Sequence, residues 1–363
     1  MVSEPSGSSP KRIAFLVENH FEDVEFQIPF TALRQAGAEV KILGSRMTDE
    51  YVGKHGNVHI RPDASTTEVR AEDFDGFVIP GGYAPDRLRT FDQTVRLVVD
   101  AIAQNKIIAT VCHGPQLLIE ADQLHGKQAT GFRAIRKDMQ NAGANYVNQA
   151  VVVDGNLITS RRPGDMVPFT LTLLNKLNLQ IPGKALPNPD EQQYELWHLA
   201  EQWGGSTLDE IVSALSRVFL SERYTLTEFQ HYERMVEEAD VKAIFRDIES
   251  MKANHIELLE RRLRGLKGAV TWQAVRKDAF TPLQDYRQAA DTGVILRRSL
   301  GDLQTGAIDA NQFASQLTDP ITVQLLEQIS MNLERYEEQL GDLYRTRMGT
   351  QVQPPIPTMP AAC

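Results

Sequence analysis

The chain has 363 residues, of which 42% are hydrophobic and 24% are charged. These values are typical of globular proteins, and the length favours two domains. The formal net charge is −10 at pH 7, and no basic run is present. We therefore expect no nucleic-acid partner, because phosphate contacts supply most of that affinity.

No apolar run approaches the roughly 18 residues of a membrane-spanning helix, so no membrane partner is predicted. The first residues, MVSEPSGSSP, lack the basic and apolar regions of a signal peptide. The chain contains only two cysteines, and one is the last residue. This count excludes a disulfide scaffold and predicts a reducing, cytoplasmic location.

Short apolar runs alternate with amphipathic stretches in the first half of the chain. This alternation predicts an α/β domain with a mostly parallel sheet that is covered by helices on both faces. Asp154-Gly155 separates two short apolar runs and predicts a hairpin. The expected strands are 13–17, 39–43, 77–80, 107–111, 150–153 and 157–159, and the expected helices are 26–35, 95–103 and 166–177.

Helical periodicity replaces the strand pattern after a segment rich in proline. We expect an α/β domain over 11–180, a linker over 181–190 and a helical bundle over 191–348. Residues 1–10 and 349–363 are predicted to be disordered. Helix starts are predicted at Thr207 and Thr225, each followed by a capping glutamate, and at the proline-containing pairs Thr281-Pro282 and Asp319-Pro320, while helices are expected over 191–203 and 241–265.

Cys112 lies in the segment ATVCHGP, at the point where an apolar strand gives way to a helix. This arrangement is typical of a nucleophile elbow, in which the turn exposes the side chain and the helix N-terminus favours negative charge. We therefore expect a reactive thiol with a lowered pKa. The alternative is a small buried hydrophobic side chain, which is the commoner role of a lone cysteine.

The segments around this cysteine resemble the ThiJ/PfpI family. The resemblance implies the flavodoxin-like sandwich of class I glutamine amidotransferase-like domains. The matching segments, in chain order, are VENHFEDVE (17–25), GKHG (53–56), FVIPGGYAPDR (77–87), TVCHGPQLL (110–118), GFRAIRKDMQNAGA (131–144) and VVVDGNLITSRRPGD (151–165).

The resemblance implies a role for each of four side chains. Cys112 matches the nucleophile, and Glu22 matches an acid that approaches the thiol. A carboxyl beside a thiolate is expected to be protonated and to donate a hydrogen bond, because two anions in contact repel each other. His113 matches the imidazole of the catalytic pair, and Asp86 matches an acid that reaches this imidazole from a neighbouring subunit. The chain is therefore expected to form at least a homodimer.

The resemblance also implies a backbone oxyanion site. Its donors are expected to be the N–H groups of Gly81, Gly82 and His113, which would stabilise a tetrahedral intermediate. No cofactor and no metal are implied for this site. The expected substrate is a small molecule or a peptide.

Two classes of function remain open. The first is a PfpI-like, stress-related enzyme that uses Cys112 against a carbonyl or amide, as a peptidase or amidase or in a glyoxalase-like or deglycase-like reaction. The second is a redox-sensing or chaperone-like stress protein whose Cys112 is oxidised without turnover.

The helical half resembles ferritin-like and rubrerythrin-like domains, most closely over 231–263. A carboxylate-bridged metal pair needs Glu-x-x-His on each of two helices. His255 is preceded at three residues by Lys252, and the last helix carries Leu333 and Tyr336 in the comparable positions. We therefore predict a bundle without metal, in which His255 is a hydrogen-bonded core residue.

Overall fold

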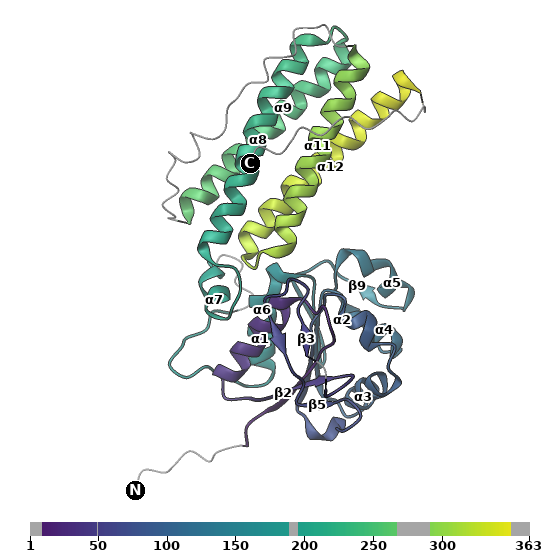
Figure 1. Ribbon diagram of the computed structural model, residues 1–363, viewed down its shortest axis with the longest axis vertical. Helices are drawn as coiled ribbons and strands as arrows, with labels where there is room; N and C mark the ends of the chain where they lie inside the picture. Colours follow the sequence, from purple (N-terminus) through teal and green to yellow (C-terminus); the bar gives the residue numbers. More distant parts are fainter. Residues whose placement is uncertain (1–8, 49, 189–194, 267–290, 350–363) are drawn as a thin grey trace. The chain divides into compact units, whose positions relative to one another are not determined.

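The computed structural model describes residues 9–48, 50–188, 195–266 and 291–349 (Figure 1). The chain divides into two compact units. The first extends through Ser206 and includes Thr318–Pro320, and the second contains the helical residues from Thr207 onward. Within the described ranges, no helix is both long and apolar enough to cross a membrane.

A seven-stranded sheet forms the centre of the first unit. Its strands are β1 (Arg12–Leu16), β2 (Glu39–Gly44), β5 (Ala64–Ser65), β6 (Gly76–Ile79), β7 (Ile107–Val111), β10 (Val151–Asp154) and β11 (Leu157–Ser160). Their order is β10-β11-β7-β6-β1-β2-β5, and all neighbours pair in parallel except β10 and β11. Two smaller pairs join β3 (Tyr51–Val52) to β4 (His59–Ile60) and β8 (Gln128–Ala129) to β9 (Asn145–Tyr146).

Helices cover both faces of this sheet, as Figure 1 shows. Strand β1 explains why, because Ile13 and Phe15 belong to one buried cluster whereas Ala14 and Leu16 belong to another. A strand buried on both faces has no polar side. One face carries α1 (Asp23–Gln35), α6 (Met166–Lys176) and α7 (Trp197–Gln202), and the other carries α3 (Asp92–Ala103), α4 (Pro115–Glu120) and α5 (Arg136–Asn141).

This arrangement confirms the predicted flavodoxin-like α/β fold. Three 3₁₀ turns, at Ala71–Asp73, Arg133–Ile135 and Pro163–Asp165, and the short helix α2 (Ala84–Leu88) complete the unit. The predicted hairpin around Asp154-Gly155 is present as β10 and β11. Helix α1 begins at Asp23, three residues before the predicted start, and this difference affects the functional site.

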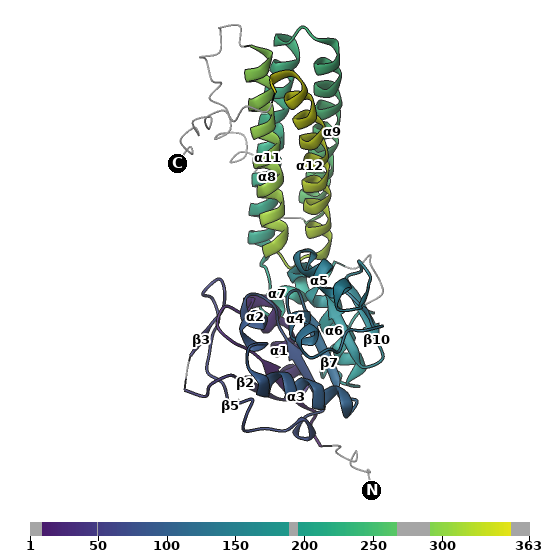
Figure 2. The same ribbon diagram turned by 90° about the vertical axis from the view of Figure 1, so that its right-hand side faces the viewer.

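The second unit confirms the predicted bundle. Four long helices lie side by side within its described residues (Figure 2): α8 (Leu208–Met235), α9 (Ala239–Gly265), α11 (Thr292–Gln316) and α12 (Pro320–Met348). The Thr207 hydroxyl accepts the Glu210 N–H, and the Glu210 carboxylate accepts the Thr207 N–H, so the predicted capping box is formed. The predicted start at Pro320 is also confirmed.

The predicted helix start at Thr225 is wrong. Helix α8 runs through this position without a break, and the Thr225 hydroxyl donates to the Ser221 carbonyl at 2.8 Å. A threonine inside a helix satisfies its hydroxyl on the preceding turn in this way. The Thr-x-x-Glu pattern therefore does not mark a helix end when the apolar stripe continues on both sides.

The boundary between the units also differs from the expectation. Helix α7, predicted as part of the bundle, packs in the α/β core through Leu196, Ala200 and Trp203. The Trp203 indole N–H donates to the Gln35 side chain at 3.3 Å. The predicted start at Thr281-Pro282, residues 189–194 and most of the predicted disordered ends lie outside the described residues.

Candidate functional site

Three neighbouring parallel strands, β7, β6 and β1, end at the same edge of the sheet, where open α/β sheets bind ligands. Cys112 directly follows β7 and has a φ of 59°. A residue other than glycine in this left-handed region costs about 1–3 kcal/mol of strain. The Cys112 N–H donates to Ser160 at 3.0 Å, and its carbonyl accepts the Phe132 N–H at 2.9 Å. Both backbone groups are thus fixed while the side chain is turned out of the strand.

The glycines after β6 approach the cysteine closely. A Cβ atom at Gly81 would lie 2.6 Å from both the Cys112 Cβ and a Glu25 oxygen. Gly82 has a φ of 76°, and a Cβ there would lie 2.4 Å from the His20 carbonyl oxygen. Only glycine allows the end of β6 to pass this near the thiol.

The expected oxyanion site needs free N–H donors at Gly81 and Gly82, but both N–H groups already have an acceptor. The Gly81 N–H donates to the Glu25 carboxyl at 2.8 Å. The Gly82 N–H is directed at the Cys112 sulfur. Among the described residues, no backbone carbonyl accepts the His113 N–H. His113 is therefore the expected donor that remains available.

Glu25, rather than Glu22, is the acid that lies against the thiol. Its carboxyl interacts directly with the Cys112 side chain and is fully buried. Its Oε2 accepts the Gly81 N–H, while no nitrogen or oxygen in the described part of the chain hydrogen-bonds to its buried Oε1. The expectation that Glu22 makes this contact is corrected, because helix α1 already includes Glu25 and turns it toward the sheet edge.

Burial raises the pKa of the Cys112 thiol, and the nearby charges of Glu25 and Glu22 raise it further. The Gly82 N–H opposes this effect. The thiol pKa is therefore raised, and the expected lowering is not found with Glu25 and Glu22 ionised. Burial also raises the pKa of Glu25 well above its ordinary range, and the charge of Glu22 adds to this. The two groups are close enough to titrate as a pair.

Glu22 is instead part of an ion-paired group beside the thiol. Its Oε2 lies 3.2 Å from the Lys54 ammonium, and its Oε1 lies 2.9 Å from the His55 Nε2. Burial alone would lower the pKa of Lys54, but the charge and hydrogen bond of Glu22 outweigh it and raise this pKa. Lys54 also interacts electrostatically with Cys112.

His113 follows the cysteine, and its ring lies 5.2 Å from that of Phe132. Burial, followed by the charge of Lys54, lowers the pKa of His113, whereas Asp86 raises it. The ordinary pKa of an imidazole is about 6.5, and that of His113 is lower, so the His113 imidazole is neutral at pH 7. Asp86 is exposed on α2 and forms an ion pair of 2.8 Å with Arg89. Its expected contact with a neighbouring subunit stays a prediction.

Sequence reasoning missed Glu25, Lys54 and His55. A signal for Glu25 exists, because it lies on the buried stripe of α1 formed by positions 25, 28, 29, 32 and 33. An acid on an apolar helical face is rarely buried without a role. Lys54 and His55 lie in the GKHG segment, which was matched as a motif without a role for either residue.

The bundle has a polar centre of its own. The Lys252 ammonium lies 2.9 Å from Glu222 Oε1, and the His255 Nδ1 lies 2.8 Å from Glu222 Oε2. The His255 Nε2 is 3.1 Å from the Asn332 side-chain nitrogen. Lys252 and His255 are fully buried, which confirms that His255 is a hydrogen-bonded core residue.

These residues do not fit the metal pair of ferritin-like proteins. The Lys252 ammonium contacts the carboxylate that a metal would need, and a cation there would be repelled. The described residues contain no group of three or more histidine, cysteine, aspartate or glutamate side chains arranged to hold a metal. We therefore derive no chemistry from a metal in this unit.

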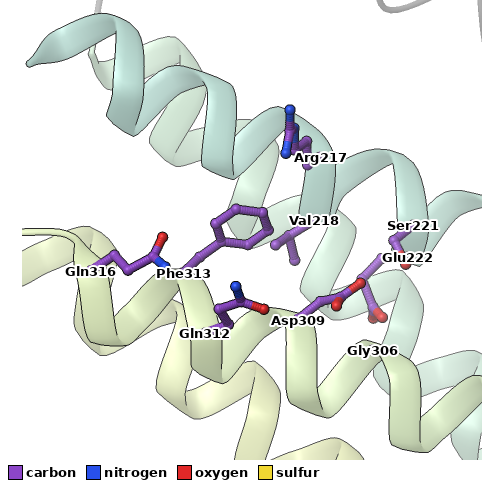
Figure 3. A pocket seen from close by; sticks show the side chains of 9 residues that line it. All are labelled: Arg217, Val218, Ser221, Glu222, Gly306, Asp309, Gln312, Phe313 and Gln316. Carbon is purple, nitrogen blue, oxygen red and sulfur yellow. The ribbon is translucent and has the colours of Figure 1, made fainter. Parts of the chain in front are cut away.

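A pocket of about 340 Å³ opens between α8 and α11. Figure 3 shows Glu222 and Asp309 extending from the two helices toward the same end of this pocket, next to Gly306. Val218 and Phe313 form its apolar middle. Glu222 is already paired with two buried side chains, so it contributes to the pocket wall chiefly as part of the polar centre.

The α/β site and its sheet are those of a known family. Residues 11–176 match the DJ-1/PfpI family. The chain is 43% identical over 167 residues to the "Putative cysteine protease YraA" of Bacillus subtilis (strain 168), covering 46% of this chain and 98% of that protein. It is also 43% identical over 155 residues to Deglycase PfpI of Pyrococcus furiosus, covering 43% of this chain and 92% of that protein. The chain belongs to the DJ-1/PfpI family.

A second comparison includes the helical half of the chain. A crystal structure from Anabaena variabilis ATCC 29413, of a two-domain protein containing DJ-1/ThiJ/PfpI-like and ferritin-like domains, matches with a TM-score of 0.87 and 45% identity. The match covers 97% of this chain and 100% of that one. The chain is thus a DJ-1/PfpI domain followed by a ferritin-like helical bundle, as the sequence predicted.

Proposed function

We propose that the chain is a cysteine-dependent enzyme in which the Cys112 thiolate attacks an electrophilic carbonyl carbon. The observation that carries this proposal is the strained turn at Cys112, which sets its sulfur between the Glu25 carboxyl and the Gly82 N–H. Strain is retained where the surroundings enforce it, and such positions cluster at functional sites. A cysteine that served only for packing would need neither the strain nor a buried acid.

The proton of the thiol–acid pair is proposed to reside on Glu25 in the reactive state. A buried carboxylate with one oxygen lacking a donor is costly, whereas a neutral carboxyl is not. A protonated Glu25 no longer repels the thiolate, and its O–H becomes a donor to the sulfur. The Gly82 N–H supplies a second donor, so two hydrogen bonds would offset the cost that burial imposes on the thiolate.

In the proposed step, the sulfur electron pair forms the C–S bond and the carbonyl π pair moves to oxygen. The His113 N–H, which donates to no backbone carbonyl among the described residues, is proposed to stabilise this oxygen. With an amide, the C–N bond breaks as the carbonyl re-forms, and the leaving amine takes the proton that Glu25 received from the thiol. Water then hydrolyses the thioester, with the neutral His113 imidazole as the general base and Glu25 regaining the proton. With an aldehyde, the oxygen takes up a proton and a hemithioacetal results.

Turnover by the purified full chain tests this proposal. Methylglyoxal and a fluorogenic peptide amide represent the two carbonyl classes, and Cys112→Ser provides the control. We expect steady turnover of at least one class by the unchanged chain and none by Cys112→Ser. Turnover that survives in Cys112→Ser would refute the role of the thiol.

The same pair of donors favours a second candidate, in which Cys112 is oxidised without turnover. A sulfenate or sulfinate oxygen next to the sulfur is an acceptor that a protonated Glu25 can bind. Mass measurement after limited peroxide separates the candidates. Stoichiometric addition of oxygen at Cys112, with no turnover of either carbonyl class, would favour the sensor over the enzyme.

A further inference from the structure

The loop that carries Lys54 is held rigidly against the start of α1. The Asp23 carboxylate accepts three backbone N–H groups, those of His55, Asn57 and Val58, each at 2.9 Å. A Cβ atom at Gly53 would lie 2.4 Å from the Asp23 carboxyl, so only glycine permits this contact. A carboxylate with three backbone donors fixes the conformation of the segment that supplies them.

A second set of contacts joins this loop to the thiol site. The Lys54 N–H donates to the Phe21 carbonyl at 2.7 Å, and Phe21 forms an isolated bridge with Gly82. The Lys54 ammonium lies 3.2 Å from Glu22 and 5.8 Å from the centre of the Tyr83 ring. Its side chain is 38% exposed, so the ammonium stays hydrated on one side. The position of the Lys54 ammonium is therefore set both by the backbone of its loop and by the Glu22 carboxylate.

Among the described groups that interact electrostatically with Cys112, Lys54 carries a positive charge. The charge of Glu22 opposes ionisation of the thiol, as that of Glu25 would if Glu25 were ionised, and neither carboxyl carries the positive charge that a thiolate needs nearby. His113 is neutral near pH 7, and Asp86 is paired with Arg89. The titratable or charged groups that act on the thiol, or on the groups beside it, are Glu22, Glu25, Lys54, His55, Tyr83, Asp86 and His113.

We propose that Lys54 is a positioning residue that supplies the counter-charge for the Cys112 thiolate, and that Asp23 holds it in place through the loop. The inference rests on the proposed function only in taking Cys112 as the reacting group. Glu22 then acts as the anchor of the ammonium rather than as the acid that contacts the sulfur. Because Glu22 partly neutralises the charge of Lys54, it also limits how far Lys54 can lower the pKa of the Cys112 thiol.

The ionisation of the thiol tests this directly. Thiolate absorbance in the ultraviolet is measured against pH for the full chain, with Cys112→Ser as the baseline that removes the signal of Cys363. In Lys54→Met we expect the Cys112 pKa to rise by about one pH unit, which lowers the thiolate fraction near neutrality about tenfold. Lys54→Arg, which keeps the charge, should restore most of this difference.

Glu22→Gln provides a test of opposite sign. Removing this carboxylate should lower the Cys112 pKa, because its charge disfavours the thiolate. Lys41→Met is the matched control, since Lys41 is also a lysine paired with a glutamate, here Glu39 at 4.0 Å. It should leave the Cys112 pKa unchanged. If Lys54→Met fails to fold, Lys54→Gln, which removes the charge but keeps a polar side chain, is measured in its place and should show the same rise in the Cys112 pKa.

The inference and the proposed function can fail separately. A Cys112 pKa that is the same in Lys54→Met and the unchanged chain would overturn the role of Lys54, whatever the turnover. An unaltered pKa in Glu22→Gln would do the same. If the shifts appear as expected but no carbonyl compound is turned over, the enzyme proposal fails while the role of Lys54 stands.

Discussion

Replacing Glu25 by glutamine decides where the proton of the thiol–acid pair resides. The substitution keeps the size of the side chain and an oxygen that can still accept the Gly81 N–H. It removes the O–H donor if Glu25 is protonated, and it removes a negative charge if Glu25 is ionised. The two states therefore predict opposite shifts of the Cys112 pKa, upward in the first case and downward in the second.

We expect an upward shift of about one pH unit. A hydrogen bond to a charged group contributes about 1.5–3 kcal/mol, against about 0.5–1.5 kcal/mol for a neutral one. Because an amide N–H is a weaker donor than a carboxylic O–H, the thiolate of Glu25→Gln loses about 1–1.5 kcal/mol, and 1.36 kcal/mol corresponds to one unit of pKa. The thiolate fraction near neutral pH should then fall about tenfold.

The assay is the rate of alkylation at Cys112, followed by mass from acidic to alkaline pH. Glu39→Gln serves as a control, because this exposed glutamate on β2 is remote from the thiol. A fall in the Cys112 pKa of Glu25→Gln would refute the assignment of the proton to Glu25. An upward shift in Glu22→Gln instead would restore the sequence-based choice of acid.

Further predictions concern the bundle and the assembly. Lys252→Met should destabilise the bundle by up to about 3–5 kcal/mol in chemical denaturation, since it leaves the buried Glu222 charge with His255 as its remaining ion-pair partner among the described residues, and adding Glu222→Gln should recover most of this loss. Burial raises the pKa of Asp302 to about 6, so the contribution of Asp302 to the stability of the folded chain falls as pH rises from about 4 to about 6. Asp302→Asn should remove that loss and add up to about 3 kcal/mol at pH 7.5; equal stability of the two chains there would contradict the burial argument. Light scattering should show at least a dimer, and a monomer would remove the basis for an Asp86–His113 contact between subunits. Elemental analysis should find no stoichiometric iron, manganese or zinc, and two metals per chain would overturn the argument from Lys252.

The fold was predictable because its local and global signals agree. The apolar run over 107–111 ends where β7 ends, and Cys112 directly after it has a φ of 59°. Strand and helix alternate, so the parallel sheet follows from connectivity alone. In the bundle, the capping box at Thr207 and the proline at 320 each mark a real helix end.

The acid of the site was not predictable with the same means, and the reason is a helix boundary. The apolar pattern placed the start of the helix at Phe26, which left Glu25 in a loop with no assigned face. The helix in fact starts at Asp23, since α1 tolerates two acidic residues in its first turn. A difference of three residues therefore moved Glu25 from a loop onto a buried face. Helix ends carry the weakest sequence signal, and functional side chains often lie there.

The partner of His255 was equally hidden. The stripe of α9 indicates that His255 is buried, but the sequence does not set the register of α9 against α8. That register brings Glu222 to both Lys252 and His255. Contacts between helices depend on side-chain packing over the whole interface, which periodicity within one helix does not encode.

Each unit contains a buried carboxylate that forms an ion pair with a lysine, and the two pairs differ in the exposure of the lysine side chain. Lys252 and Glu222 are 0% and 2% exposed, so both charges are buried and their pairing acts chiefly on stability. Lys54 is 38% exposed while its partner Glu22 is 6% exposed. An ammonium that is fixed on one side and open on the other can respond to a charge that forms nearby, as a thiolate does. The same kind of ion pair therefore has a structural role where both partners are enclosed, and the role in reactivity proposed for Lys54 fits a cation that is open on one side.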